Sequence, residues 1–276
     1  MALTRWTGAL GDGDWNQVGN WNSTVPGSAD VVLFPKDGVT SAPSVNMTHD
    51  TIGFDQVIVE RGTTYAIGTS GNPLATVVSY LLHEGTGTFY FNYQDASAYA
   101  GAERGHIVVR SPNQSLAAVI AGDDAIAQVD IIEGNVTVNN TNGVARLFVR
   151  PDNLPSQARV TIPSTSLVIE TVNDGGIVTI ESGANPTEVH MISGKIVNSS
   201  AALASSNFIL GGTWDQRVVD ITGIGTSLFL LGGTLDTTNV VGAVLGDLYI
   251  GSRATILRGA GASFVNEYEI GGTDLI

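Results

Sequence analysis

The sequence contains no cysteine, which excludes disulfides, cysteine-ligated zinc and thiol nucleophiles. Lysine occurs only at Lys36 and Lys195, and charged residues make up 14% of the chain. An α-rich protein would carry more lysine and glutamate on its exposed helix faces. The shortage of lysine beside 34 glycines therefore favours a chain of turns and buried strands.

Long apolar runs are also missing. The longest, Val240 to Ile250, is interrupted by Gly242, Gly246 and Asp247, and a bilayer span needs about 18 apolar residues. The N-terminal residues lack a basic start followed by an apolar stretch, so we expect no secretory signal. We expect a protein that is made in the host cytoplasm and does not contact a membrane.

Basic residues are scarce, with 12 against 26 acidic ones and a formal net charge of −14. Sequence-independent binding of nucleic acid needs clustered lysine and arginine, so we expect no nucleic-acid partner. A hydrophobic fraction of 43% is enough for a substantial core and argues against global disorder.

What the sequence does contain is a repeat of about twenty residues. An apolar residue precedes glycine at Leu210, Leu231, Ile250 and Ile270, with spacings of 21, 19 and 20. Short apolar strands that end at Ile132, Val149, Ile169 and Ile192 extend the series backwards. Repeats of this length are the signature of solenoids.

The repeating units read as strands. Segments such as 136–138, 160–162 and 177–180 alternate β-branched and polar residues, and turn clusters such as 139–143 separate them. One coil buries too few side chains to offset the entropy of ordering it, so coils must stack. The sequence predicts an all-β fold, a right-handed parallel β-helix over residues 46–276; a large β-sandwich is the alternative.

The N-terminal segment, residues 1–45, differs from the rest because it holds three of the four tryptophans, Trp6, Trp15 and Trp21. The ends of a β-helix expose core and strand edges and need a cover. We interpret the segment as a capping turn over the first coil. A docking arm for a partner surface is the second interpretation, and both can hold together.

The order Trp-x-Gly, Trp, Asn-Trp, Pro-Gly and Asp-Val-Val-x-Phe within residues 5–34 resembles the start of bacterial β-helical adhesin passengers. It also resembles β-helical proteins encoded in the head-gene region of tailed phages. The resemblance implies a β-helix and a surface or virion role. An adhesin needs an export signal that we do not expect here, and the chain reads as complete after its last coil, which favours the virion protein.

Since β-helices often host polysaccharide-cleaving enzymes, paired carboxylates were considered as catalytic residues. The candidates are Asp123 with Asp124, Asp130 with Glu133, and Glu181 with Glu188. No catalytic frame joins any of them, and Asp123-Asp124 reads first as a turn. We expect no catalytic residues.

The remaining motifs favour structure over chemistry. The four histidines are interpreted as surface or turn residues; they are His49, His83, His106 and His190. The stretch 11–14, Gly-Asp-Gly-Asp, lacks the rest of a calcium loop, and 223–226 lacks the helix of a dinucleotide site. Aromatic residues in 89–93 are expected in the core or an interface, followed by a protruding loop at 95–102. We expect no metal and no cofactor.

Together these features predict a structural virion protein that decorates or cements a phage capsid, attached by multivalent non-covalent contacts. We expect a homotrimer whose partner is the major capsid protein, located on the capsid surface. The docking residues expected are Arg5, Trp6, Trp15 and Trp21. The alternatives are a β-helical tailspike that binds or degrades carbohydrate, and a surface adhesin passenger.

Overall fold

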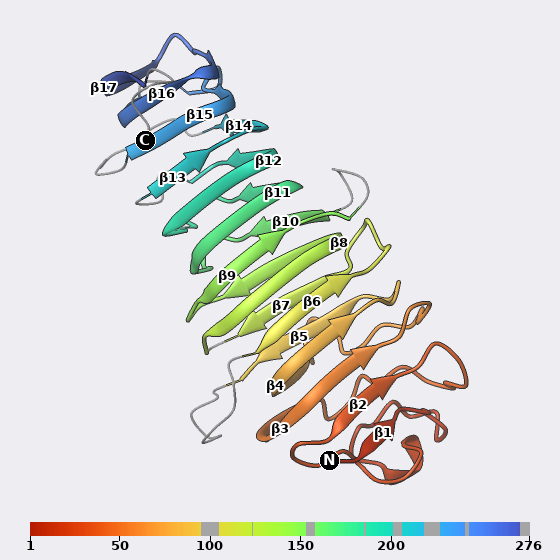
Figure 1. The fold of residues 1–276 in the computed structure, drawn as a ribbon. Coiled ribbons are helices and arrows are strands. Elements are labelled where there is room, and N and C mark those ends of the chain that lie inside the picture. Colours follow the sequence, from red (N-terminus) through yellow and green to blue (C-terminus); the bar gives the residue numbers. More distant parts are fainter. Residues whose placement is uncertain are drawn as a thin grey trace. The chain divides into compact units, whose positions relative to one another are not determined.

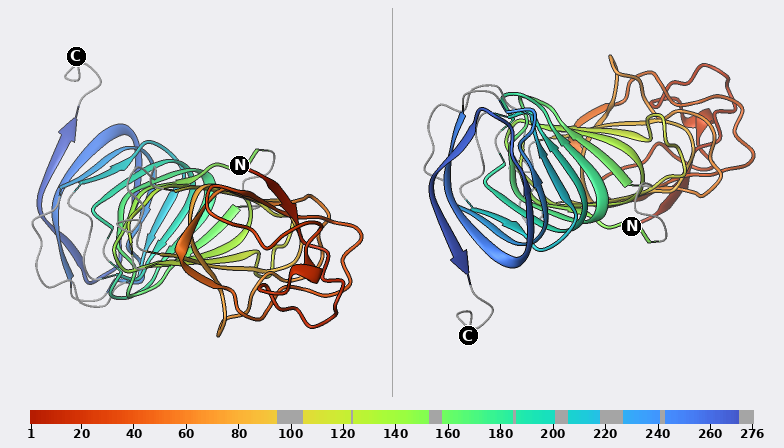
Figure 2. Two further views of the ribbon diagram at one scale, coloured as in Figure 1. Left: turned by 90° about the horizontal axis from the view of Figure 1, so that it is seen from below. Right: turned by 90° about the horizontal axis from the view of Figure 1, so that it is seen from above.

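The computed structural model describes residues 1–94, 105–122, 124–152, 158–184, 186–200, 206–217, 227–240 and 243–270. The chain forms two compact units, Met1–Val144 and Ala145–Ile276. It is a parallel β-solenoid of about 10 turns, and the expected β-helix is confirmed over the β-sandwich. Figure 1 labels the strands, and Figure 2 shows the coils of each unit enclosing an interior. Among the described residues, no helix is long and apolar enough to cross a membrane.

The first unit contains eight described strands and a short 3₁₀ helix, η1 (Val18–Asn20). The strands are β1 (Leu3–Arg5), β2 (Val31–Phe34), β3 (Thr48–Val59), β4 (Leu74–His83), β5 (Phe89–Tyr93), β6 (His106–Arg110), β7 (Ala118–Gly122) and β8 (Ile126–Asn140). Parallel pairing runs along β1, β2, β3, β4, β6 and β8, and along β4, β5, β7 and β8. Within the expected capping segment 1–45, β1 and β2 therefore already stack as coils.

The second unit continues the same pattern from strand β9, which begins at the unit boundary. Its strands are β9 (Val144–Val149), β10 (Ala158–Ile162), β11 (Val168–Ile180), β12 (Glu188–Asn198), β13 (Ser206–Ile209), β14 (Thr213–Gln216), β15 (Ser227–Asp236), β16 (Ala243–Leu257) and β17 (Ala262–Ile270). Each long strand pairs in parallel with its counterpart one coil later. The strands β12 and β15 each supply two segments of a coil, because each pairs with β13 at its first segment and with β14 at its second.

The core of each unit consists of columns of inward side chains in register. In the first unit one buried column runs through Val32, Val57, Leu81, Ile107 and Val129. In the second unit a buried column runs through Val160, Val178, Ile196, Trp214 and Leu235. Because strand side chains alternate between faces, the period of two inside each segment produces these columns. No single coil encloses them, so stacking supplies the core.

Glycines at one corner of the second unit also stack. Gly194, Gly212 and Gly233 have φ of +84°, +78° and +75°. A Cβ on Gly212 would lie 2.4 Å from the carbonyl oxygen of Gly194, and one on Gly233 would lie 2.6 Å from that of Gly212. Glycine is thus required at this corner both by the backbone conformation and by the close approach of the next coil.

The register corrects the alignment of the repeat. Phe229 pairs with Tyr249, so Ile250 pairs with Leu230 and not with Leu231, the residue to which the sequence pattern matched it. The period near twenty is confirmed, but the phase was wrong by one residue in the later coils. The physical reason is a register shift after Leu230, which changes the number of residues at the corner without changing the stack.

The last described strand, β17, departs from the core pattern. Its Glu267 pairs with the buried Leu248 and its Glu269 with the half-buried Ile250, so carboxylates occupy the positions of apolar residues in the preceding coil. Arg258 contacts Glu267 through two hydrogen bonds of 2.7 and 2.5 Å, and its guanidinium lies 5.4 Å from the Phe264 ring centroid. The apolar residues of β16 are therefore followed by exposed carboxylates on β17.

Candidate functional site

The three N-terminal tryptophans meet in one cluster. The ring centroids of Trp15 and Trp21 are 4.6 Å apart, and those of Trp6 and Trp21 are 5.0 Å apart, both edge-to-face. Trp15 also contacts Phe34 and Phe54 of β2 and β3, at 6.0 and 5.9 Å. The cluster therefore closes the core of the first coils, which supports the expected tryptophan-rich cap.

Hydrogen bonds complete this cap. The Trp6 Nε1 donates to the Ser41 carbonyl oxygen, and the Trp21 Nε1 donates to that of Trp15, both at 2.8 Å. Along the free edge of β1, the Asn22 N–H donates to the Arg5 carbonyl at 3.0 Å, and the Arg5 N–H donates to Asn22 Oδ1 at 2.7 Å. The exposed strand edge is thereby covered by its own chain.

The stretch 11–14 belongs to the same cap. Asn20 is fully buried and donates its Nδ2 to Asp12 Oδ1 at 2.6 Å and to the Asp14 carbonyl at 2.9 Å. The hydrogen bond from Asn20 lowers the pKa of Asp12. Asp14 Oδ1 accepts the Asn16 N–H at 2.9 Å and the Asn46 Nδ2 at 2.8 Å. Both carboxylates thus organise turns of the cap.

The structure places the expected docking residues together, but mostly inside the molecule. Trp6 and Trp15 are 0% exposed and Trp21 is 5% exposed, while Arg5 is half-buried and donates its Nη2 to the Asp37 carbonyl at 2.7 Å. A buried indole cannot meet a partner surface in the folded protein. The docking role of these four residues stays a prediction. A direct contact with a partner protein would have to be made by exposed residues nearby.

Those exposed neighbours are apolar. Four large side chains in the first eighteen residues are exposed by more than half: Met1 (85%), Leu3 (60%), Leu10 (55%) and Val18 (57%). Leu10 lies over Gly19, since a Cβ there would be 3.1 Å from the Leu10 methyl carbons. Leu10 and Val18 are therefore neighbours, and we call these two residues the cap patch.

An open groove of about 310 Å³ lies beside Arg5. It is lined by Lys36, Thr64, Tyr65 and residues 37–42. The Tyr65 hydroxyl donates to the Pro35 carbonyl at 2.9 Å, and burial raises the pKa of Tyr65. The groove offers hydroxyl groups together with the Lys36 ammonium and the Asp37 carboxylate, which lie 3.9 Å apart.

The expected carboxylate pairs are engaged in other contacts. Asp130 Oδ2 lies 2.6 Å from His106 Nε2 and accepts Gln128 Nε2 at 2.6 Å, while Glu133 pairs in register with Arg110. These contacts tie β8 to β6 on an outer face of the first unit.

In the other two pairs, the described residues lie at turns and strand ends. Asp123 lies outside the described residues, and Asp124 Oδ1 accepts the N–H of Ala125 at 2.8 Å, as expected for a turn. Glu181 follows β11, and Glu188 begins β12 with its Oε2 at 3.7 Å from His190 Nε2.

Two histidines correct the expectation that all four lie at the surface or in turns. His83 is 0% exposed and His49 is 7% exposed. His83 Nε2 lies 3.1 Å from the Ala117 carbonyl oxygen, and burial lowers the pKa of His83 to about 4. Both face the core because they occupy inward-facing positions on their strands. The residues next to them in the sequence do not show which face of the strand points inward. Among the described residues, no three His, Asp or Glu side chains gather as metal ligands.

The aromatic stretch 89–93 contributes to the core, as one of the two expected placements predicted. Phe89, Phe91 and Tyr93 are buried, and the rings of Phe89 and Phe91 stack at 5.6 Å. The loop expected at 95–102 and the motif at 223–226 lie outside the described residues.

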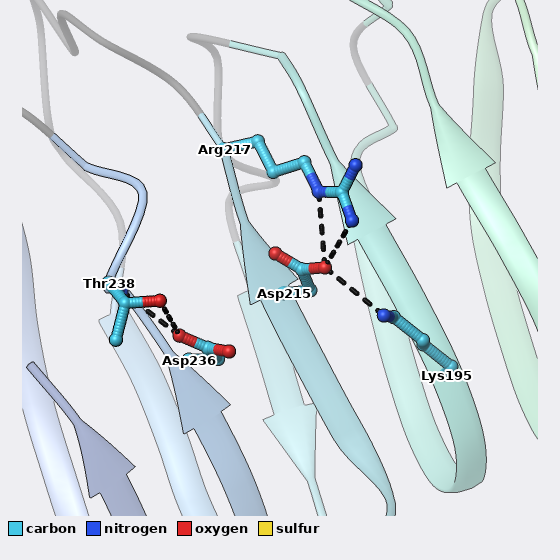
Figure 3. A network of polar contacts seen from close by, with 5 residues as sticks. All are labelled: Lys195, Asp215, Arg217, Asp236 and Thr238. Atoms are coloured by element: carbon cyan, nitrogen blue, oxygen red, sulfur yellow. Dashed lines mark hydrogen bonds and ion pairs between the residues drawn. The ribbon is translucent and has the colours of Figure 1, made fainter.

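A polar network in the second unit was missed by the sequence reasoning (Figure 3). Asp215 Oδ2 accepts Arg217 Nη2 at 2.7 Å and lies 3.1 Å from Lys195 Nζ. The Asp215 side chain is 6% exposed, and the hydrogen bond from Arg217, with help from Lys195, lowers its pKa. Asp236 pairs with Asp215 in register on β15, but its Oδ1 instead accepts hydrogen bonds from the N–H and the hydroxyl of Thr238. Lys195 and Asp215 come together because of the alignment of successive coils. The sequence around either residue does not show that alignment.

No family model matches the sequence, and neither a curated protein nor a solved structure matches it.

Proposed function

We propose that the chain is a structural protein that decorates or cements the capsid of a tailed phage and has no enzymatic activity. It binds the major capsid protein as a homotrimer, and several weak contacts together give tight attachment. The resemblance of residues 5–34 to head-region phage proteins supports the virion setting. Stacked coils with buried columns supply a rigid body suited to this role.

The observation that carries the attachment is the cap patch. The first coil is sealed by its own tryptophans and hydrogen bonds, so Leu10 and Val18 are not needed to close the core. Large apolar side chains left exposed on a closed cap favour a protein partner. The attachment surface is therefore the cap patch around the buried tryptophans and not the indoles themselves.

The alternatives rest on weaker support. A tailspike that degrades polysaccharide needs two free carboxylates across a cleft, but Asp130 is engaged with His106 and Gln128. A glycan-binding tailspike or an adhesin passenger would use the groove beside Lys36 and Tyr65.

The test is to locate and count the chain in virions of the phage that encodes it, by quantitative mass spectrometry and electron cryo-microscopy. Tens to hundreds of copies on the head support decoration. A few copies at the tail tip support the spike, and absence from particles overturns both.

Point variants then test the cap patch on particles that lack the protein. We expect Leu10→Asp with Val18→Asp to abolish rebinding, while Val265→Asp, a 58% exposed site on β17, leaves it unchanged. Deleting residues 1–24 is a poor test, because it removes the three buried tryptophans. Unchanged rebinding of the folded double variant would rule out the cap patch.

A further inference from the structure

A ladder of stacked rings runs along the outside of the second unit. His190, Phe208, Phe229, Tyr249 and Tyr268 pair in register on β12, β13, β15, β16 and β17. Successive ring centroids are 5.2, 4.9, 4.6 and 4.9 Å apart, with interplanar angles of 28°, 8°, 10° and 18°. We call these five residues the aromatic strip.

The strip faces away from the core and continues into exposed aliphatic residues. The residues on either side of Phe229, Leu228 and Leu230, are buried, so the ring itself points outward. Beside the strip, Ile192 is 43% exposed and Leu210 is 51% exposed. Both side chains are exposed, which leaves apolar area on the outer face of this sheet.

Ring orientation argues for a protein partner over a sugar. Since the rings stack face to face, each interior ring has both faces covered by its neighbours and offers only its edge. Carbohydrate stacking on an aromatic residue needs an open ring face. A row of edges instead forms a flat apolar surface on which another sheet can pack.

Charges on the two sides of the strip identify the partner as a second copy. On β12, Glu188 lies on one side and contacts His190 at 3.7 Å, and Lys195 follows the glycine corner on the other side and contacts Asp215 at 3.1 Å. On β16, Asp247 and Arg253 lie in the same order. If two copies pack in parallel about an axis along the strip, Asp247 faces Arg253 of the second copy, whereas Glu188 and Lys195 already have partners within their own chain. An antiparallel copy would place acid against acid.

The size of the strip fits the centre of such an interface. Five coils at about 4.8 Å span about 20 Å, and two rows of side chains cover on the order of 250 Å². A stable interface buries about 800 Å² per partner, with an apolar centre and a polar rim. The acidic and basic flanks are placed to supply that rim.

We propose that the chain self-associates side by side and in parallel through the aromatic strip, with its acidic flank against the basic flank of the next copy. The same arrangement serves any rotational symmetry about an axis along the strip, the expected trimer included. This inference rests on the proposed function in one respect, the expectation of an oligomer. The aromatic strip is the surface that we propose forms that oligomer.

The first test is sedimentation equilibrium of the purified chain over a range of concentrations. We expect the wild type to be oligomeric, and Leu210→Asp to raise the dissociation constant by at least about tenfold, because it places a carboxylate in the apolar centre. Val45→Asp, at a 41% exposed site in the first unit, is the matched control and should associate as the wild type does. Circular dichroism checks that each variant is folded.

A charge exchange tests the parallel arrangement and does not depend on Leu210. Asp247→Lys should weaken association, and the double variant Asp247→Lys with Arg253→Asp should restore it, since each charge again meets its opposite in the second copy. A wild type that is monomeric up to on the order of 100 μM overturns the inference. So does an oligomer that neither Leu210→Asp nor Asp247→Lys weakens, or a double variant that stays as weak as Asp247→Lys.

These outcomes are separate from those of the proposed function. An oligomer that depends on the strip but is absent from virions supports the interface and overturns capsid decoration. A monomer that still decorates capsids supports capsid decoration and overturns the interface.

Discussion

At the scale of single residues, His83 is the clearest source of pH dependence. Its imidazole is fully buried against the Ala117 carbonyl, and burial lowers its pKa from 6.5 to about 4. Between these two values the unfolded chain binds a proton that the folded protein does not. The free energy of unfolding therefore falls as pH drops from about 6.5 towards 4.

We predict that this single group removes about 2 kcal/mol of stability between pH 7.5 and pH 5. Urea unfolding at the two pH values measures the difference. His83→Gln should be less stable at pH 7.5 and show a smaller loss on acidification. An unchanged pH dependence in a folded His83→Gln variant would show that another group is responsible.

The stacked glycines give a second prediction for single residues. Gly212→Ala combines a left-handed backbone, which costs about 1–2 kcal/mol with a side chain, with a Cβ placed 2.4 Å from a carbonyl oxygen. We expect a loss of at least about 2 kcal/mol in thermal or urea unfolding.

Two glycines separate the two causes. Gly11 has φ of +77° with nothing within 4 Å of a built Cβ, so Gly11→Ala should cost only the backbone term. Gly71 has the same open space without the positive φ, so Gly71→Ala should be near neutral. A Gly212→Ala variant no less stable than Gly11→Ala would show that the corner relaxes.

At the scale of elements, Asp215 joins β12 to β14 by contacting Lys195, and it also contacts Arg217, the residue after β14. Its folded pKa lies below 3.8, so its contribution is present above that value and is lost as pH falls through the lowered pKa. The two cations are 41% and 49% exposed, and solvent screening reduces what they contribute.

We predict that Asp215→Asn lowers the free energy of unfolding at pH 7 by about 1–2 kcal/mol and reduces the acid sensitivity below pH 4. Asp236→Asn is the matched control, because Asp236 is the register neighbour and contacts only Thr238 in Figure 3. Equal losses in the two variants, measured by urea unfolding, would contradict a cross-strand role for Asp215.

Element positions show what the repeat could and could not predict. The spacing near twenty residues identified stacked coils, because every coil needs the same number of residues to return to its corner. It could not fix the phase, since Leu230 and Leu231 are equally apolar while only the first faces inward. Buried His83 and the contact of Lys195 with Asp215 were missed for the same reason: both depend on register between coils.

At the scale of the whole molecule, composition and repeat were sufficient for the fold class. The shortage of lysine and the many glycines excluded a helical protein, and the tryptophan-rich start indicated a cap. The cap's outer surface was not predictable, because the indoles suggested anchors whereas Leu10 and Val18 carry the exposed area. Large aromatic side chains bury more apolar area than small side chains do. Clustered tryptophans therefore indicate a buried core more strongly than a contact with a partner protein.

The carboxylates of β17 have a consequence for aggregation. A bare parallel edge offers unpaired N–H and C=O groups that can recruit further chains into amyloid-like growth. Any strand added there in register would have to bury Glu269 and the Glu267–Arg258 pair against its own apolar residues, and an uncompensated buried charge costs several kcal/mol. A purely apolar strand is therefore a poor partner for β17.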